Sequence, residues 1–193
     1  MKGATLALVL AGAVLTASPA LATPITYIEQ VTATGSLGGI AFTNASIVLT
    51  TPGDTANVIP GQFPFSFTNV GTATVSVNGG PAATFSNPIT VIADHHNQGV
   101  AFFDIGSDLL FISNTSFATY DLTTPIGPIS GAPFSEFMVD YPTSDGPFIV
   151  SSILGNTATF TATTSSAVPE PSSLALFGGA LLGLGPLRRR RVR

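Results

Sequence analysis

Asp94-His95-His96-Asn97 is the densest group of potential metal ligands in the sequence. Two imidazoles beside a carboxylate could bind a transition metal ion. Adjacent side chains of a strand point to opposite faces, however, so His95 and His96 can share an ion only if they lie in a loop. The chain has 2 histidines in total, so no third imidazole could complete such a site. We therefore interpret the segment as an exposed turn after a strand and assign no metal to it.

Acidic residues near glycine turns offer a second candidate metal site. Calcium binds carboxylate and carbonyl oxygens, and extracellular β-domains often use it. Neither Gly106-Ser107-Asp108 nor Ser144-Asp145-Gly146 matches the EF-hand or nonapeptide calcium patterns, and both are equally good turns. We therefore expect no cofactor, with calcium as the alternative. The candidate calcium ligands are Asp104, Asp108, Asp140 and Asp145.

Signatures of hydrolytic enzymes are missing from the sequence. It contains no Gly-x-Ser-x-Gly elbow, no His-Glu-x-x-His motif and no cysteine nucleophile. A Ser-His-Asp triad or a pair of carboxylates assembled from distant positions stays open, because serine and aspartate are plentiful. We expect a protein that is not an enzyme, and we assign no catalytic residue.

The distribution of charge excludes one class of partner. Residues 23–167 contain nine acidic residues and no lysine or arginine, so their formal charge is −9. A domain without bases cannot neutralise phosphates, which excludes nucleic acid binding. The absence of cysteine excludes disulfides and thiolate metal sites. Stability must therefore come from burial and hydrogen bonds.

The first 22 residues have the pattern of a secretory signal peptide. Lys2 supplies the positive start, and Thr5 to Ala17 forms an apolar run of suitable length. Ala20 and Ala22 then provide the small-x-small site that signal peptidase accepts. We predict export across the inner membrane with cleavage after Ala22. An uncleaved membrane anchor is the alternative.

The last 26 residues, 168–193, fall into three parts. Val168-Pro169-Glu170-Pro171 is rigid and extended, because each proline fixes its own φ and restrains the preceding residue. Residues 172–187 are uncharged and would span about 24 Å as a helix, less than the roughly 30 Å of a hydrocarbon core. A cluster of arginines follows, which should stay cytoplasmic by the positive-inside rule. Its members are Arg188, Arg189, Arg190, Arg191 and Arg193.

This order of proline motif, short apolar helix and arginine cluster resembles the PEP-CTERM sorting tail. The resemblance implies that an exosortase, a membrane transpeptidase of Gram-negative bacteria that produce exopolysaccharide, recognises Pro169, Glu170 and Pro171. It also implies that the short transmembrane helix and the arginines are removed on sorting. The protein would then be anchored in the inner membrane only transiently, before it reaches the cell surface or the extracellular space. A plain tail anchor with a proline linker is the alternative.

Between the two ends, alternating polarity predicts an exported all-β domain over residues 23–167. Thr72 to Val77 and Thr157 to Thr163 alternate with a period of two, as strands with one buried face do. The spacing predicts an antiparallel β-sandwich or jelly roll, flanked by the signal helix and the short C-terminal apolar helix. A short helical turn is considered only within Ala132 to Asp140. The other predicted strands are 25–34, 40–43, 45–51, 62–68, 89–93, 100–104, 109–112, 118–122 and 148–153.

Glycine, asparagine and proline separate these strands. We predict turns at 52–54, 69–71, 78–81, 106–108, 145–147 and 155–156. The phenylalanines are spread over most strands, and we expect them to fill the core between two sheets. Sugar-binding sandwiches commonly stack sugars on exposed tryptophan or tyrosine. The chain has no tryptophan, so the only candidates for such stacking are Tyr27, Tyr120 and Tyr141.

Two segments of the domain, Thr34 to Ala45 and Ala118 to Pro128, resemble parts of uncharacterised PEP-CTERM proteins, which implies relatives of unknown activity. We therefore expect a non-enzymatic surface or extracellular-matrix protein, associated with exopolysaccharide or the cell envelope. A calcium- or glycan-binding β-sandwich module is the alternative, and a small hydrolase is a third. The expected partners are exosortase and signal peptidase during export, and exopolysaccharide afterwards.

Overall fold

The computed structural model describes residues 23–61, 66–104 and 106–165. They form 12 strands and two short 3-10 helices, and every strand pairing is antiparallel. The predicted signal and C-terminal helices lie outside these residues. The elements are β1 (Pro24–Leu37), β2 (Ile40–Asp54), η1 (Thr55–Asn57), β3 (Ile59–Pro60), β4 (Ser66–Gly71), β5 (Thr74–Val77), β6 (Ala83–Thr84), β7 (Ile89–Asp94), β8 (Gly99–Asp104), β9 (Ser107–Ser113), η2 (Thr115–Phe117), β10 (Ile126–Phe134), β11 (Phe148–Ile153) and β12 (Ala158–Thr164).

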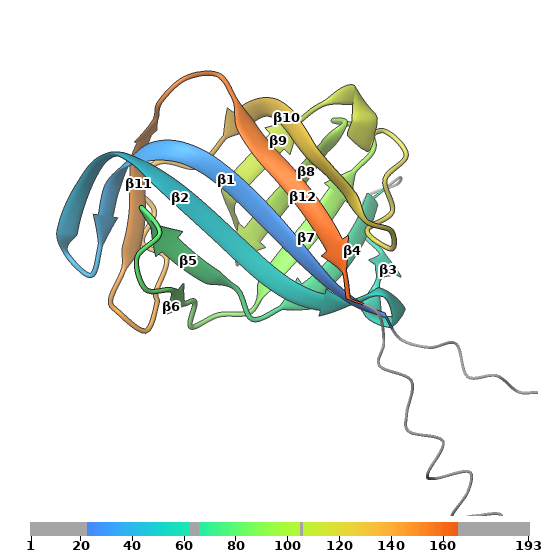
Figure 1. The fold of residues 1–193 in the computed structure, drawn as a ribbon, viewed down its shortest axis with the longest axis horizontal. Helices are drawn as coiled ribbons and strands as arrows, with labels where there is room; N and C mark the ends of the chain where they lie inside the picture. The colour runs from blue at the N-terminus through green and yellow to red at the C-terminus, as the bar shows by residue number, and fades with distance from the viewer. Residues whose placement is uncertain (1–22, 62–65, 105, 166–193) are drawn as a thin grey trace, which may run out of the picture.

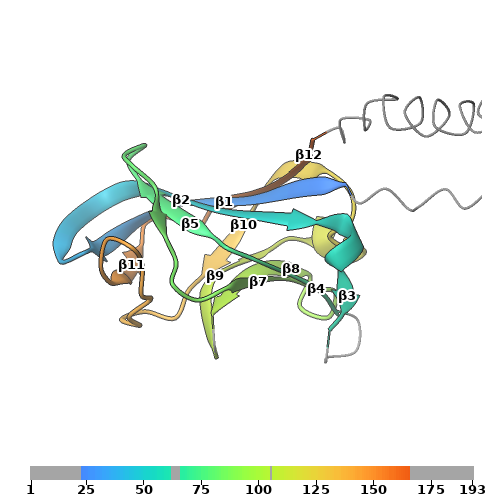
Figure 2. The same ribbon diagram turned by 90° about the horizontal axis from the view of Figure 1, so that it is seen from below.

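The strands lie in two layers that belong to one continuous sheet. Figure 2 shows β1, β2 and β12 in one layer and β4, β7, β8 and β9 in the other. β10 connects them, because residues Ile126 to Gly131 pair with β12 whereas Ala132 to Phe134 pair with β9. The prediction of an all-β antiparallel fold of the sandwich type is thus confirmed, and the sheet curls over through β10 to make both layers.

The hairpin of β1 and β2 shows why these residues form strands. Ile25, Tyr27, Glu29, Val31 and Ala33 are buried, and the residues between them are exposed or partly exposed. This alternation gives each strand one face for the core. The predicted strands 40–43 and 45–51 form a single strand, β2, in which Asn44 has a φ of 49° beside an irregularity in the ladder with β1.

The core lies between the two layers and is rich in aromatic side chains. Phe160 of β12 packs edge-on against Phe117, with ring centroids 5.5 Å apart, and against Tyr120 at 5.8 Å. Phe148 of β11 contacts Phe85 in the same T-shaped manner at 6.2 Å. Such contacts combine large buried apolar area with a preferred ring geometry. The core explains how the domain is held together without salt bridges or disulfides.

The two layers approach each other where the end of β2, beyond its pairing with β5, lies near the end of β4, beyond its pairing with β3. We call this contact the β2–β4 seam. No ladder joins these strands within the described chain; instead Asn69 Nδ2 of β4 donates hydrogen bonds to Tyr27 Oη at 2.9 Å and to the carbonyl of Asp54 at 3.0 Å. A Cβ on Gly71 would overlap the carbonyl oxygen of Pro52, and a Cβ on Gly53 would lie 2.8 Å from Asn69 Nδ2. Glycine is therefore needed for close approach.

Several local predictions were wrong. The turns predicted at 52–54 and 69–71 are parts of β2 and β4, because their glycines serve the seam rather than a turn. The strand predicted at 118–122 follows the 3-10 helix η2 and includes Leu122, whose φ is 65°. β10 was missed. The region considered for a helical turn, Ala132 to Asp140, contains the end of β10 and a turn at residues 137–138.

Both ends of the described domain lie at one end of the molecule (Figure 1). β1 and β12 are paired neighbours, with Ile25 opposite Thr164, and the amide of Ser165 donates to the carbonyl of Pro24 at 3.1 Å. The tip of the β1–β2 hairpin lies at the opposite end, where the amide of Gly38 donates to the carbonyl of Pro147 at 3.0 Å. Segments attached before residue 23 and after residue 165 therefore leave from the same end.

Candidate functional site

The structure separates the four candidate calcium ligands. Asp104 and Asp140 line a polar pocket of about 160 Å³, where Asn87 donates to Asp104 at 3.3 Å. Asp108 lines a different groove, and Asp145 accepts a hydrogen bond from Ser144 in a turn. Within the described residues, no three or more histidine, aspartate or glutamate side chains come together to hold a metal ion. Calcium binding therefore stays a prediction.

The histidine cluster forms a turn. Asp94 accepts hydrogen bonds from the amides of His96 and Asn97, at 2.9 and 3.1 Å, and from the side-chain amide of Asn97 at 2.7 Å. His95 points back to the domain: its Nε2 donates to the carbonyl of Tyr120 at 2.7 Å, and its ring packs on Phe67 at 5.4 Å. Asp94 and His95 thus act as structural residues of the β7–β8 turn.

All three tyrosines lie inside the domain. Tyr27, Tyr120 and Tyr141 are 0%, 4% and 1% exposed, so none offers a face to a sugar. Burial raises the pKa of Tyr27 to about 12 and raises the pKa of the other two as well. Each hydroxyl therefore stays neutral and donates to a carbonyl: Tyr27 to Leu122 at 2.7 Å, Tyr120 to Thr124 at 3.1 Å and Tyr141 to Asp108 at 3.1 Å.

Glu29 is a buried acid that the sequence search did not select. It is 0% exposed in the middle of β1, between Leu49 of β2 and Phe160 of β12. Neither carboxylate oxygen has a hydrogen-bond partner among the described residues. Burial, with a contribution from the charge of Asp108, raises its pKa well above the usual 4.5. The alternation of β1 could have identified it, because Glu29 follows Ile25 and Tyr27 on the inward face.

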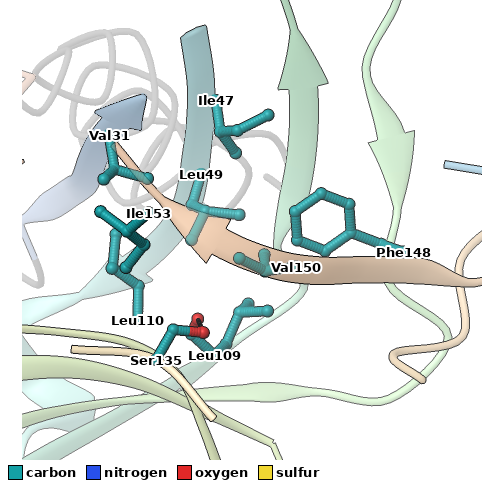
Figure 3. Close-up of a pocket in the computed structure, with 9 residues that line it drawn as sticks. All are labelled: Val31, Ile47, Leu49, Leu109, Leu110, Ser135, Phe148, Val150 and Ile153. Carbon is teal, nitrogen blue, oxygen red and sulfur yellow. Dashed lines mark hydrogen bonds between the residues drawn. The ribbon is translucent and has the colours of Figure 1, made fainter. Parts of the chain in front are cut away.

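A small internal cavity beside β11 is a packing gap. Figure 3 shows Val31, Leu110, Val150 and Phe148 around it, together with Ser135. Its volume of about 10 Å³ is at the lower limit for one water molecule, about 10–15 Å³. Ser135 Oγ, the polar group drawn at its wall, already donates to the carbonyl of Leu109 at 2.9 Å. The cavity is too small to hold a ligand.

A groove of about 620 Å³ lies on the outer face of β7, β8 and β9, and we call it the outer groove. Its floor is an apolar row that crosses four strands in register. Ile92 of β7 is opposite Ala101 of β8, Ala101 is opposite Phe111 of β9, and Phe111 is opposite Phe134 of β10. Three interstrand spacings of about 4.8 Å give this row a length of roughly 14 Å.

Glycine shapes the floor of the outer groove. A Cβ on Gly99 would overlap the ring of Phe111, so glycine at this position of β8 makes room for the ring. Phe103 also lines the groove, and Phe134 is 53% exposed. The prediction that the phenylalanines fill the core was therefore wrong for Phe103, Phe111 and Phe134. Sequence pattern alone could not show which face of these strands would be hollowed.

Polar side chains flank the apolar row on both sides. Asp108 is opposite Phe103 in the register of β8 and β9 on one side. Asp94, Asn97 and Ser113 line the other side. Burial and the charges of Glu136 and Asp94 raise the pKa of Asp108. The outer groove thus combines aromatic faces with hydrogen-bonding groups, which is the usual composition of a ligand site.

Residues 167–191 match the family model described as the PEP-CTERM protein-sorting motif. The chain carries a PEP-CTERM sorting motif. The match includes Val168 to Pro171 and the first four arginines of the cluster. No curated protein and no solved structure matches the chain.

The PEP-CTERM motif implies that the protein is exported and processed by an exosortase. It begins three residues after β12 ends at Thr164. The sorting residues, the predicted helix at 172–187 and the signal cleavage site at Ala20 and Ala22 lie outside the described residues. No helix within the described ranges is long and apolar enough to cross a membrane.

Proposed function

We propose that this is a non-enzymatic protein of the cell surface or extracellular matrix, which exosortase sorts and which associates with exopolysaccharide or the cell envelope. The observation that carries the proposal is the PEP-CTERM motif placed directly after the last strand of a packed β-domain. A C-terminal sorting motif directs the domain that precedes it out of the cell. The β-domain is therefore the part of the protein that would act outside the cell.

The positions of the two ends support this arrangement. β1 begins and β12 ends side by side, so the sorting tail and the predicted signal peptide attach at one end of the domain. While the tail is in the membrane, the hairpin tip at Gly38 would point away from it. Partly exposed threonines of β1 and β12, among them Thr26, Thr32 and Thr161, would offer hydroxyls to a hydrated polysaccharide.

Mass spectrometry of the protein from its native host would test the sorting step. We expect a mature protein that starts at Thr23, ends near Pro171 and lacks the arginines. Glu170→Gln, or loss of the exosortase, should leave the arginines in place and keep the protein in the membrane fraction. Asp140→Asn, an exposed change in the domain, is the matched control and should be sorted normally. Surface or matrix protein that retains Arg188 to Arg193 would refute the proposal.

A second candidate function is a glycan-binding module, and the outer groove favours it. This groove places three phenylalanine rings beside carboxylate, amide and hydroxyl groups on an exposed sheet face. Aromatic faces pack against the apolar faces of sugar rings, and the polar groups can bond to hydroxyls. Binding of purified protein to an array of bacterial glycans would test this function, and loss of binding in Phe134→Ala would assign it to the groove.

A further inference from the structure

The outer groove has a shape that suits a linear chain of rings. Its apolar row runs across the strands from Ile92 to Phe134, over roughly 14 Å. The Phe111 ring lies in the middle of this row, in space that a side chain at position 99 would occupy. Phe134 closes one end with about half of its surface exposed. A row of this kind offers apolar contact to a ligand that is extended in one direction.

The carboxylates on the two sides of the row differ in the hydrogen bonds that they accept. On one side, Asp94 accepts three hydrogen bonds that hold the β7–β8 turn, one of them from the side chain of Asn97. On the other side, the Asp108 side chain has no hydrogen-bond partner within the described residues, although its backbone carbonyl accepts from Glu136 and Tyr141. Asp108 is therefore the carboxylate that is available to a ligand.

Charge decides which ligands fit the groove. The groove contains two carboxylates, and residues 23–167 contain no lysine or arginine that could offset them. An anionic ligand would meet repulsion from Asp108, Asp94 and the nearby Glu136. Burial is the main cause of the raised pKa of Asp108, and the charges of Glu136 and Asp94 add to it by disfavouring the ionised form. A cationic group beside Asp108 would reverse that effect.

We propose that the outer groove binds a linear glycan that contains free amino sugars, with sugar rings on Phe111 and Phe134 and an ammonium group beside Asp108. This inference rests on the proposed association with exopolysaccharide and names the chemistry of the partner. The groove lies on the outer face of the β7–β9 layer, whereas β1 and β12, to which the terminal segments attach, form the other layer (Figure 2). The groove and the strands that carry the terminal segments therefore belong to different layers.

Calorimetric titration of the mature protein, purified from its host, would test the inference with three probes. These are a glucosamine hexamer in mildly acidic buffer, an N-acetylglucosamine hexamer and a hexamer of uronic acids. We expect the glucosamine hexamer to bind at least about tenfold more tightly than the neutral one. We expect no binding of the anionic hexamer.

Variants assign the binding to the groove. Asp108→Asn should weaken binding of the glucosamine hexamer about tenfold and leave the affinity for the neutral hexamer unchanged. Phe134→Ala should weaken binding of both hexamers. Because Phe134 is about half exposed, we expect this variant to fold normally, and an unchanged thermal unfolding temperature would verify it. Asp145→Asn and Phe137→Ala are matched controls, because both residues are exposed and neither lines the groove.

Four outcomes would overturn the inference. The first is no binding of the glucosamine hexamer, and the second is equal affinity for the cationic and neutral hexamers. The third is wild-type affinity in both Asp108→Asn and Phe134→Ala. The fourth is a groove that mediates only self-association, seen as a change in elution volume with these variants. Sorting is measured separately in the host, so normal sorting with any of these results rejects the amino-sugar site alone.

Discussion

Glu29 is held in the folded domain at an energetic cost, because its carboxyl group is buried and has no hydrogen-bond partner among the described residues. Its raised pKa means that the folded state binds this proton more tightly than the unfolded chain does. Unfolding therefore releases a proton at any pH between the usual value of 4.5 and the raised value. The free energy of unfolding must fall as the pH rises through that window.

Glu29→Gln should remove this dependence, since glutamine does not titrate. We expect the variant to lose less stability than the wild type between about pH 5 and about pH 8, as measured by urea unfolding at several pH values. Thr163→Ala, at an exposed residue that does not titrate, is the control and should keep the slope of the wild type. Equal slopes in Glu29→Gln and the wild type would show that Glu29 is solvated or paired.

Tyr27 and Asn69 form the buried hydrogen-bond network of the β2–β4 seam. Tyr27 donates to the carbonyl of Leu122 and accepts from Asn69, which also donates to the carbonyl of Asp54. Asn69→Ala should destabilise the domain by about 1–3 kcal/mol, because buried acceptors lose their donor.

A double-mutant cycle of Tyr27→Phe with Asn69→Ala would isolate the bond between the two side chains. Chemical denaturation should give a coupling energy on the order of 1 kcal/mol. Ser151→Ala, which removes an exposed hydroxyl bonded to the carbonyl of Thr34, is a control and should change stability little. Strict additivity of Tyr27→Phe and Asn69→Ala would contradict a direct interaction.

At the level of elements, the alternating strands were the predictable part of the fold. β1, β7, β11 and β12 were recognised because each buries one face, which a period of two records directly. β10 was missed because Gly127, Pro128, Gly131 and Pro133 give it the composition of a loop. β10 is a strand because it pairs with β12 and β9. The local sequence of β10 carries no information about these partners.

The same distinction applies to the functional features. The PEP-CTERM motif was predictable in full, because it is a linear signal read in order along the chain. The outer groove was not, because its floor depends on register between four strands that are separated in sequence. Asp108 was a candidate calcium ligand, and the sequence did not show that it would lie beside phenylalanine rings.

Gly71 tests the contact between β2 and β4. Gly71→Ala would place a methyl group against the carbonyl of Pro52, which is backbone and cannot rotate away. We expect a loss of about 1–3 kcal/mol in the free energy of unfolding. Gly80→Ala, where the nearest atom is 3.1 Å away, is the matched control and should cost less. An equal loss of unfolding free energy in both variants would mean that the close approach of β2 and β4 does not contribute to stability.

The whole domain carries charge of one sign. Residues 23–167 hold nine acidic residues without a base, so self-repulsion should oppose the compact state. Raising sodium chloride from about 0.01 M to about 1 M shortens the screening length from roughly 30 Å to roughly 3 Å. We expect the thermal midpoint to rise by a few degrees.

Repeating the salt series near about pH 4 provides the control, because many carboxyl groups are then neutral and repulsion is weaker. The salt effect should shrink at that pH. A salt effect of the same size at both pH values would point to general exclusion of salt from the surface rather than to screening of the acidic residues.

The position of β12 also sets the order of events during export. It is the last strand of the described domain, yet it lies between β1 and β10 rather than at an edge. A chain that crosses the membrane from its N-terminus therefore cannot close the sheet until residues 158–164 have emerged. The sorting motif begins three residues later. Completion of the fold and arrival of the exosortase substrate are thus nearly simultaneous, so exosortase would meet a domain that has only just become able to fold.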